Sequence, residues 1–400
     1  MKLLKQIAIL TTLQIIFGFG FSVINGNIAI LVNLFLTLMI FLMGIRNSLF
    51  SLNLGKIWIM IPLSVLILWH SREQNLVGLF VNIVQVFSIC LIISLRIDIL
   101  RETKAVFLRL FSVVSAVSLF FWILYLLGIS VFPSFSIGYS DIYELQNHIV
   151  FVETTDKMFM RFQCLFVEPG LYGMLCVISL ILNDFRKDKK SFIYILSALF
   201  SLSLSTYLLL LLSFIYRMFV FKRVKLYVSI LVMGGLVGLC VFFTNYNGGD
   251  NIINEAIFFR LQLDDDNKMI AYNRATDYFE DYYKRNVKGG VLLFGIGSEK
   301  YSAFHFENSV DVRAYITLDG LVGFALFLCF YLLTLRYTGV NKYTFLVIGV
   351  YLIIFLRGFV FSFSFGGLLL YIISMFSYKN LRPYQTYKLK THEYTICPSK

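Results

Sequence analysis

The chain has 400 residues, of which 58% are hydrophobic and 14% charged, and its mean hydropathy is +0.79. These values exclude a soluble globular domain and indicate a membrane protein. The formal net charge of +12 does not call for nucleic acid as a partner, because Lys and Arg occur in short groups between apolar runs, as in cytoplasmic loops. Membrane lipids with anionic headgroups suffice as partners for these groups.

Apolar runs long enough to cross a hydrocarbon core of ~30 Å recur along the chain, for example at residues 28–45, 76–95 and 106–127. In lipid such runs must be helical, because the backbone has no water to bind. No small-residue cleavage site follows the first apolar run, so we expect it to remain as the first span. The alternation of basic groups with outward turns predicts about twelve transmembrane helices and two cytoplasmic termini.

This all-α polytopic arrangement requires two short helices in 191–217 and two more in 342–379. The expected segments are helices 1–5 in 1–127, a first long outward loop in 128–160, helices 6–9 in 161–243, a large outward loop in 244–312, helices 10–12 in 313–378 and a basic cytoplasmic tail in 379–400. An external helix is expected over 272–286, which contains no Gly or Pro. Because catalytic residues favour long loops on a rigid scaffold, we look for function on the outward face.

The segment from Arg161 to Gly173 places a carboxylate, Glu168, and Pro169 at the start of a span. A charge inside a membrane is costly, so Glu168 should face a polar cavity or a cation. Arg161 is a candidate partner, since seven residues correspond to two helical turns. The alternatives are a structural ion pair for Glu168, a headgroup anchor for Arg161 and ordinary helix-start chemistry for Pro169.

Four arginines, Arg260, Arg274, Arg313 and Arg357, are predicted outside or at the outer interface. A convergent set of guanidinium groups would bind a diphosphate, whereas scattered surface arginines are the alternative.

His305, close to Asn308, would supply a base or orient a hydroxyl, unless it is a solvated loop residue. The run Asp264–Asp266 is expected to be solvated rather than metal-binding, and Gly295–Gly297 is expected to form a turn. No metal-ligand spacing or cofactor signature is present, which favours a metal-independent reaction on an activated, lipid-borne substrate.

The order of these motifs resembles the Wzy family of O-antigen and capsule repeat-unit polymerases, within the O-antigen polymerase and ligase superfamily. The likeness rests on five stretches: Arg161–Gly173, Ser201–Tyr207, Arg274 with Phe294–Gly297, Glu307–Ser309 and Leu318–Gly323.

The resemblance implies a membrane glycosyltransferase of GT-C-like architecture in the bacterial inner membrane, with its active face toward the periplasm. It would transfer the growing glycan from undecaprenyl diphosphate to a sugar hydroxyl of an incoming lipid-linked repeat unit. Donor and acceptor would both be undecaprenyl-diphosphate-linked oligosaccharides, a chain-length regulator would be a further partner, and no cofactor is implied.

In this scheme Arg161 and Arg274 match the family's outward arginines, and Glu168 occupies the position of the motif carboxylate. Glu168 is the first candidate for the proton acceptor, on the hypothesis that burial makes this carboxylate a stronger base. Substrate binding would involve Arg260, Arg313, Arg357, His305 and Asn308.

Three alternatives stay open. An O-antigen ligase would transfer finished glycan to lipid A core, but ligases tend to carry His-Asn where this chain has Glu307-Asn308. A lipid-linked glycan flippase belongs to another class, and the large outward loop and Glu168-Pro169-Gly170 argue against it. A non-enzymatic scaffold would leave Glu168 and the outer arginines unexplained.

Overall fold

A computed structural model describes residues 2–19, 26–72, 74–140, 143–154, 161–221, 242, 245–249, 276–306, 311–357 and 364–379. The description covers the backbone alone at residues 2, 26, 27, 137–140, 143, 144, 154, 219, 221, 249, 277 and 357.

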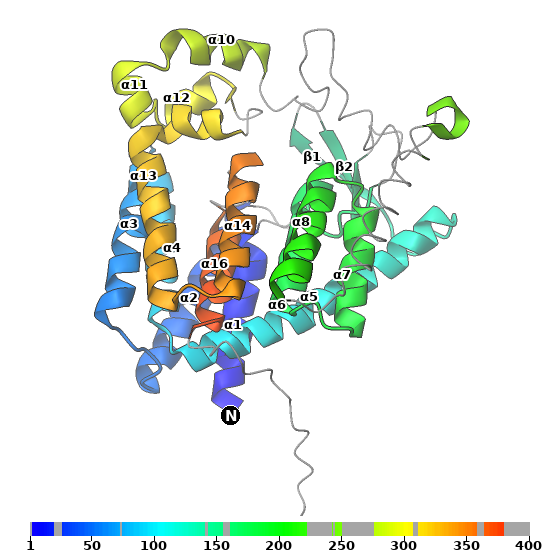
Figure 1. Cartoon of the computed structure of the whole chain (residues 1–400), viewed down its shortest axis with the longest axis horizontal. Helices are drawn as coiled ribbons and strands as arrows, with labels where there is room; N and C mark the ends of the chain where they lie inside the picture. The colour runs from blue at the N-terminus through cyan, green and yellow to red at the C-terminus, as the bar shows by residue number, and fades with distance from the viewer. Residues whose placement is uncertain are drawn as a thin grey trace, which may run out of the picture.

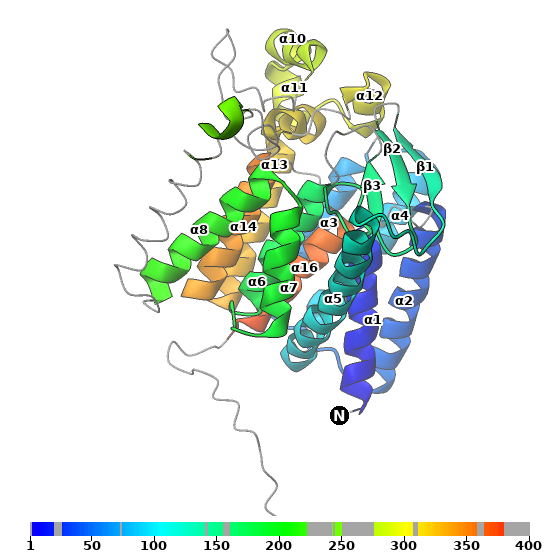
Figure 2. The ribbon, with the colours of Figure 1, turned by 90° about the vertical axis from the view of Figure 1, so that its right-hand side faces the viewer.

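The described part of the chain is mostly helical, and its apolar helices form one bundle (Figures 1 and 2). These helices are α1 (Lys2–Gly18), α2 (Gly26–Arg46), α3 (Leu54–His70), α4 (Leu76–Ser94), α5 (Ile97–Leu126), α6 (Pro169–Leu182), α7 (Lys189–Phe200), α8 (Leu204–Phe221), α13 (Val312–Thr338), α14 (Lys342–Arg357) and α16 (Phe365–Ser377). A short 3₁₀ turn, η1, covers Tyr246–Gly249. Helix pairs therefore occur in both 191–217 and 342–379, as the sequence required.

Four of the described helices are long and apolar enough to cross a membrane: Ile28–Arg46, Leu76–Ser94, Ile97–Leu126 and Val312–Thr338. Helix α2 exposes Leu31, Phe35, Leu38 and Leu42, spaced three or four residues apart, along one side. An apolar stripe on the outside of a bundle fits lipid as the surrounding solvent. The chain is therefore a helical membrane protein.

Helix α16 forms the centre of the bundle, and every one of its residues is buried. It packs against α1, α5, α13 and α14 (Figure 2). Aromatic rings join it to α13, where the centroids of Tyr331 and Tyr371 are 4.4 Å apart and those of Phe330 and Tyr371 5.6 Å apart.

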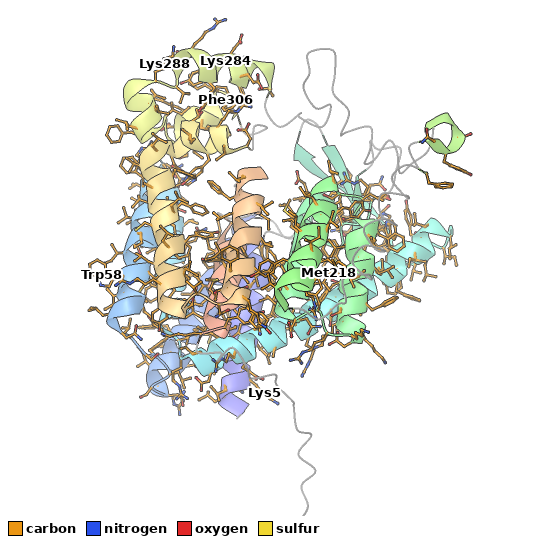
Figure 3. The ribbon with its side chains drawn as sticks, viewed as in Figure 1. Lys5, Trp58, Met218, Lys284, Lys288 and Phe306 are labelled. Carbon is orange, nitrogen blue, oxygen red and sulfur yellow. The ribbon has the colours of Figure 1, made fainter. Side chains whose placement is uncertain are left out.

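One end of the bundle is here called the basic end. The loops at this end carry basic residues that the sequence predicts on the cytoplasmic side. Buried Lys56 donates from Nζ to the carbonyl of Leu95 at 2.6 Å and so caps the end of α4. Arg101 donates to the carbonyl of Lys379 at 2.6 Å, and Lys104 lies over the Tyr378 ring. Lys5 lies at this same end (Figure 3).

The opposite end, here called the loop end, carries the long segments between helices (Figure 1). The loop predicted at 128–160 contains an antiparallel three-stranded sheet that the sequence analysis did not anticipate, in the order β1 (Phe135–Ser140), β2 (Tyr143–Asn147) and β3 (Val152–Thr154). Glu153 joins the sheet to α5, because its carboxylate accepts from Tyr125 at 2.9 Å and lies 3.0 Å from His148 Nε2.

Three short helices cover α13 at the loop end (Figure 1), namely α10 (Asp277–Asn286), α11 (Gly289–Phe294) and α12 (Ser298–Ala303). Helix α10 is the described part of the external helix expected over 272–286. Phe306 lies beneath it among aromatic rings, with centroid distances of 5.2 Å to Phe279 and 4.9 Å to Tyr282, whereas Lys284 and Lys288 point away (Figure 3).

Helix α13 is interrupted at Gly320, whose φ of 72° and ψ of −178° are almost restricted to glycine. The chain between α11 and α12 pairs with this interruption: Ile296 N donates to Thr317 O at 2.8 Å, and Gly297 N to Leu318 O at 3.0 Å. Gly295, also at φ 72°, lies so close that a Cβ there would be 2.3 Å from Leu318 O. Glycine at both positions thus lets the two backbones meet.

We expect Gly320→Ala to destabilise the protein by at least about 1–3 kcal/mol, because alanine is strained at this backbone conformation. Its Cβ would also lie 2.3 Å from the carbonyl oxygen of Leu293. Thermal unfolding in detergent measures the effect. Gly349→Ala is the matched control, since a Cβ there meets nothing within 4 Å. Equal melting temperatures for the two variants would contradict this account of the interruption.

Candidate functional site

Two stretches singled out in the sequence, Arg161–Gly173 and the serine-rich turn Ser201–Tyr207, lie against each other at the loop end. Arg161 Nε donates to the carbonyl of Ser201 at 3.1 Å, and Phe162 N donates to Phe200 O at 3.0 Å. A Cβ on Gly173 would lie 2.1 Å from Thr206 Oγ1, so only glycine permits this approach of α6 to α8. We call this junction the α6–α8 site.

The segment 161–168 is not helical, and α6 begins only at Pro169. Proline fits the first helical position but disfavours a helical conformation in the residue before it, which here is the N-cap Glu168 (φ −129°, ψ 130°). The expectation that Arg161 and Glu168 are two helical turns apart is therefore wrong. Instead the segment is held by tertiary bonds, such as Val152 N donating to Cys164 O at 2.7 Å.

Aromatic packing fixes the irregular segment on the bundle. Phe162 is buried, with its ring centroid 5.3 Å from that of Trp122 and 5.2 Å from that of Tyr172. Gln163 follows, fully buried, and neither of its side-chain polar atoms has a hydrogen-bond partner among the residues that the structure describes. A buried amide without hydrogen bonds costs free energy, so we expect the Gln163 side chain to form a hydrogen bond with a further polar group.

The two charged residues of the α6–α8 site differ in exposure. Arg161 is half-buried, and Glu168 is exposed, with no bond from its carboxylate to the N-terminus of α6. The prediction that Glu168 is buried, on which its role as proton acceptor rested, is therefore wrong. An exposed carboxylate can still accept hydrogen bonds from the hydroxyls of a glycan.

Arg313, predicted to bind substrate, is bound to two carboxylates. Its Nη2 lies 2.8 Å from Asp311 Oδ2 and 3.3 Å from Glu280 Oε1, and its guanidinium lies over the Tyr283 ring. Asp311 also caps α13 by accepting from the backbone N–H groups of Arg313 and Ala314. These bonds join α10 to the start of α13, which makes Arg313 a structural clamp.

Of the other predicted binding residues, His305 is the one whose side chain the structure describes. His305 is exposed, in the turn that follows α12. Arg357 ends α14, and its side chain lies outside the description. Arg260, Arg274 and Asn308 fall outside the described residues, as does the run Asp264–Asp266.

The sequence analysis missed a polar group at the end of α3, where Trp69, His70 and Arg72 contact α11 and α13. Arg72 Nη2 donates to the carbonyl of Phe294 at 2.5 Å, and Trp69 Nε1 to the carbonyl of Asp319 at 2.9 Å. The signal was a Trp-His-Ser-Arg run closing a span, where ionisable residues are costly.

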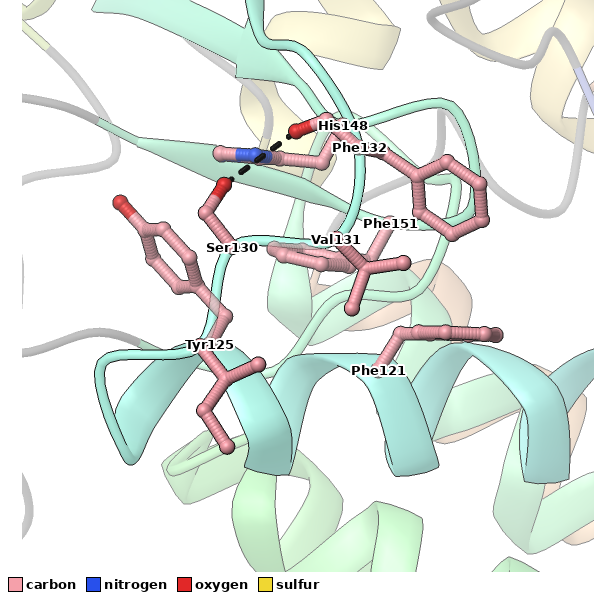
Figure 4. Close-up of a pocket in the computed structure, with 8 residues that line it drawn as sticks. Phe121, Tyr125, Ser130, Val131, Phe132, His148 and Phe151 are labelled. Atoms are coloured by element: carbon pink, nitrogen blue, oxygen red, sulfur yellow. Dashed lines mark hydrogen bonds between the residues drawn. The ribbon is translucent and has the colours of Figure 1, made fainter.

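A small pocket lies between α5 and the loop before β1 (Figure 4). Its walls are largely aromatic, and the rings of His148 and Phe151 stack with their centroids 4.5 Å apart. Ser130 donates to the carbonyl of Phe132 across it, at 3.3 Å. His148 is already paired with Glu153, since its Nε2 lies 3.0 Å from Oε1 of that carboxylate.

The chain matches no protein-family model, and neither the curated proteins nor the solved structures give a significant match. The resemblance to Wzy polymerases therefore rests on the motifs in the sequence.

We expect Arg313→Gln to lower the stability of the protein by about 1–3 kcal/mol, because the largely buried carboxylates of Asp311 and Glu280 lose their bonds to the guanidinium, although Glu280 keeps its pair with exposed Lys284. Faster proteolysis near α10 and a lower melting temperature in detergent are the measurements. Arg285→Gln is the control, since its pair with Asp281 is exposed on the same helix. If both variants melted like wild type, Arg313 would not be a clamp.

Proposed function

We propose that this protein polymerises lipid-linked polysaccharide repeat units. It transfers the growing glycan from undecaprenyl diphosphate to a sugar hydroxyl of an incoming undecaprenyl-diphosphate-linked unit. The observation that carries the proposal is the α6–α8 site, because two separate motifs of the Wzy resemblance meet there through Arg161 and Gly173. A second meeting of motifs, Phe294–Gly297 with Leu318–Gly320, supports it.

The chemistry of the α6–α8 site suits a diphosphate-bearing glycan. The half-buried guanidinium of Arg161 provides charge-assisted hydrogen bonds to phosphate oxygens or to the glycan, and partial burial strengthens them. The exposed carboxylate of Glu168 is suited to bind sugar hydroxyls. In the proposal Arg274 and Arg260 contribute further cations from the large outward loop.

The charge distribution supports an orientation for this reaction. Basic residues at the basic end of the bundle, among them Lys5 and Arg101, would face the cytoplasm. The loop end, with the α6–α8 site, would then face the periplasm of a bacterial inner membrane, where lipid-linked units arrive after flipping. Membrane lipids and a chain-length regulator are the further partners in this proposal.

Gel electrophoresis of the surface polysaccharide from a strain in which this gene is deleted tests the proposal. We expect a single capped repeat in the deletion strain and a full ladder when wild type is restored. Arg161→Ala and Arg274→Ala, expressed at matched levels, should lower polymerisation roughly 10- to 100-fold, the loss expected for one or two charge-assisted bonds. Arg285→Ala, on exposed α10, should give the wild-type ladder.

Two other outcomes would contradict polymerase function. Polymer that accumulates on its lipid carrier in the deletion strain, with no surface glycan, would indicate a ligase. Single lipid-linked units trapped on the cytoplasmic side would indicate a flippase.

A further inference from the structure

His70, the last residue of α3, and Asp319, within α13, form a hydrogen-bonded pair at the loop end. Nδ1 of His70 lies 2.9 Å from Oδ2 of Asp319. An ionised carboxylate only accepts hydrogen bonds, so Nδ1 carries the proton and donates it to Asp319. Nε2 is then the basic nitrogen of the neutral ring, and it has no hydrogen-bond partner among the described residues.

The fold holds Asp319 rigidly from both sides. The interruption at Gly320 follows directly, and the next residue toward the N-terminus, Leu318, accepts the bond from Gly297. The interruption also frees the Asp319 carbonyl, which accepts from Trp69 Nε1 at 2.9 Å. Two successive side chains of α3 thus bind one residue of α13, and this fixes the imidazole ring relative to the carboxylate.

The exposure of the pair is asymmetric. The Asp319 side chain is 1% exposed, whereas that of His70 is 33% exposed. In the other histidine–carboxylate pair of the described chain, His148 with Glu153, both side chains are buried, with exposures of 4% and 7%. A buried carboxylate that orients a partly exposed histidine is the arrangement of a general base with its positioning group.

The free-energy cost of burying Asp319 also indicates a function. Asp319 lies inside Val312–Thr338, a helix able to cross a membrane, and its Oδ1 has no hydrogen-bond partner in the described part of the chain. A buried ion pair adds little stability over apolar packing of the same volume, so stability alone does not account for it. Arg72, two residues after His70, is half-buried, and its guanidinium lies 4.4 Å from the Trp69 ring centroid.

We propose that His70, oriented by Asp319, is the proton acceptor of the glycosyl transfer proposed above, on which this inference rests. As the acceptor oxygen forms its bond to the anomeric carbon of the donor, its proton passes to Nε2. The bond from that carbon to the diphosphate breaks, and the electron pair leaves with undecaprenyl diphosphate. Asp319 stabilises the imidazolium, which then gives its proton to the diphosphate or to water.

This proposal divides the work between two places at the loop end. A polymerase holds two lipid-linked substrates at once, and α14 and α16 lie between the α3–α13 pair and the α6–α8 site (Figure 1). The acceptor hydroxyl meets the anomeric carbon of the donor beside His70, and the α6–α8 site binds a more distant part of one of the two glycans. Asp319 is a positioning residue and His70 the catalytic one.

Purified protein and lipid-linked material extracted from the deletion strain test the assignment by the rate of bond formation. We expect His70→Ala to lower the rate roughly 10²–10⁴-fold, the usual contribution of a general base. Added imidazole should restore part of the rate in His70→Ala and none in Arg161→Ala. Asp319→Asn should be slower than wild type, but the double variant should be no slower than His70→Ala, because Asp319 acts through His70.

Controls separate this assignment from folding and from the proposed function. Lys288→Ala, on the exposed surface, should keep the wild-type rate, and His70→Gln repeats the test if His70→Ala is not stably produced. Glu168→Gln keeps an acceptor oxygen and should stay within about tenfold of wild type. A His70→Ala rate within about twofold of wild type, or a loss in Glu168→Gln as large as that in His70→Ala, overturns the assignment alone. A wild-type protein that forms no bond overturns the proposed function as well.

Discussion

Backbone groups that leave a helix inside an apolar bundle must find partners within the protein, because lipid offers none. Two such places shape the loop end. The segment before α6 is bonded to Phe200 and Val152, and the interruption of α13 is bonded to Ile296 and Gly297. Each requires specific chain pairing, and each lies beside ionisable side chains at the loop end: Arg161 and Glu168 at the first, and His70 at the second. The proposed chemistry depends on these two breaks in regular structure.

The charges of the described chain fall into two groups by how they are compensated. Lys56 and Arg313 are tied to carbonyls or carboxylates and hold elements together. His148 and Glu153 pair with each other, and both side chains are buried. By contrast, the Glu168 side chain is exposed at the loop end, and the His70 side chain is partly exposed there. Since surface and buried ion pairs add little stability by themselves, the accessible groups are the ones that a function must explain.

Composition and apolar runs predicted a helical membrane protein, because the cost of burying polar backbone in lipid leaves little choice. They did not predict the sheet at 135–154, since short strands in a loop carry too few residues for a clear alternation. Motif order singled out Arg161–Gly173 and Ser201–Tyr207, which lie against each other in the structure. Helical spacing misplaced Arg161 relative to Glu168, because α6 begins only at Pro169. The pairing of His70 with Asp319 joins residues 249 positions apart, which no local pattern encodes.

In the proposed polymerisation, one kind of lipid-linked substrate serves as both donor and acceptor. The most direct measurement supplies purified protein with lipid-linked repeat units from the deletion strain and nothing else, and then measures both chain length and released undecaprenyl diphosphate. The account predicts a ladder, with one undecaprenyl diphosphate released for each bond formed. No ladder and no release, with folded wild-type protein, would contradict it.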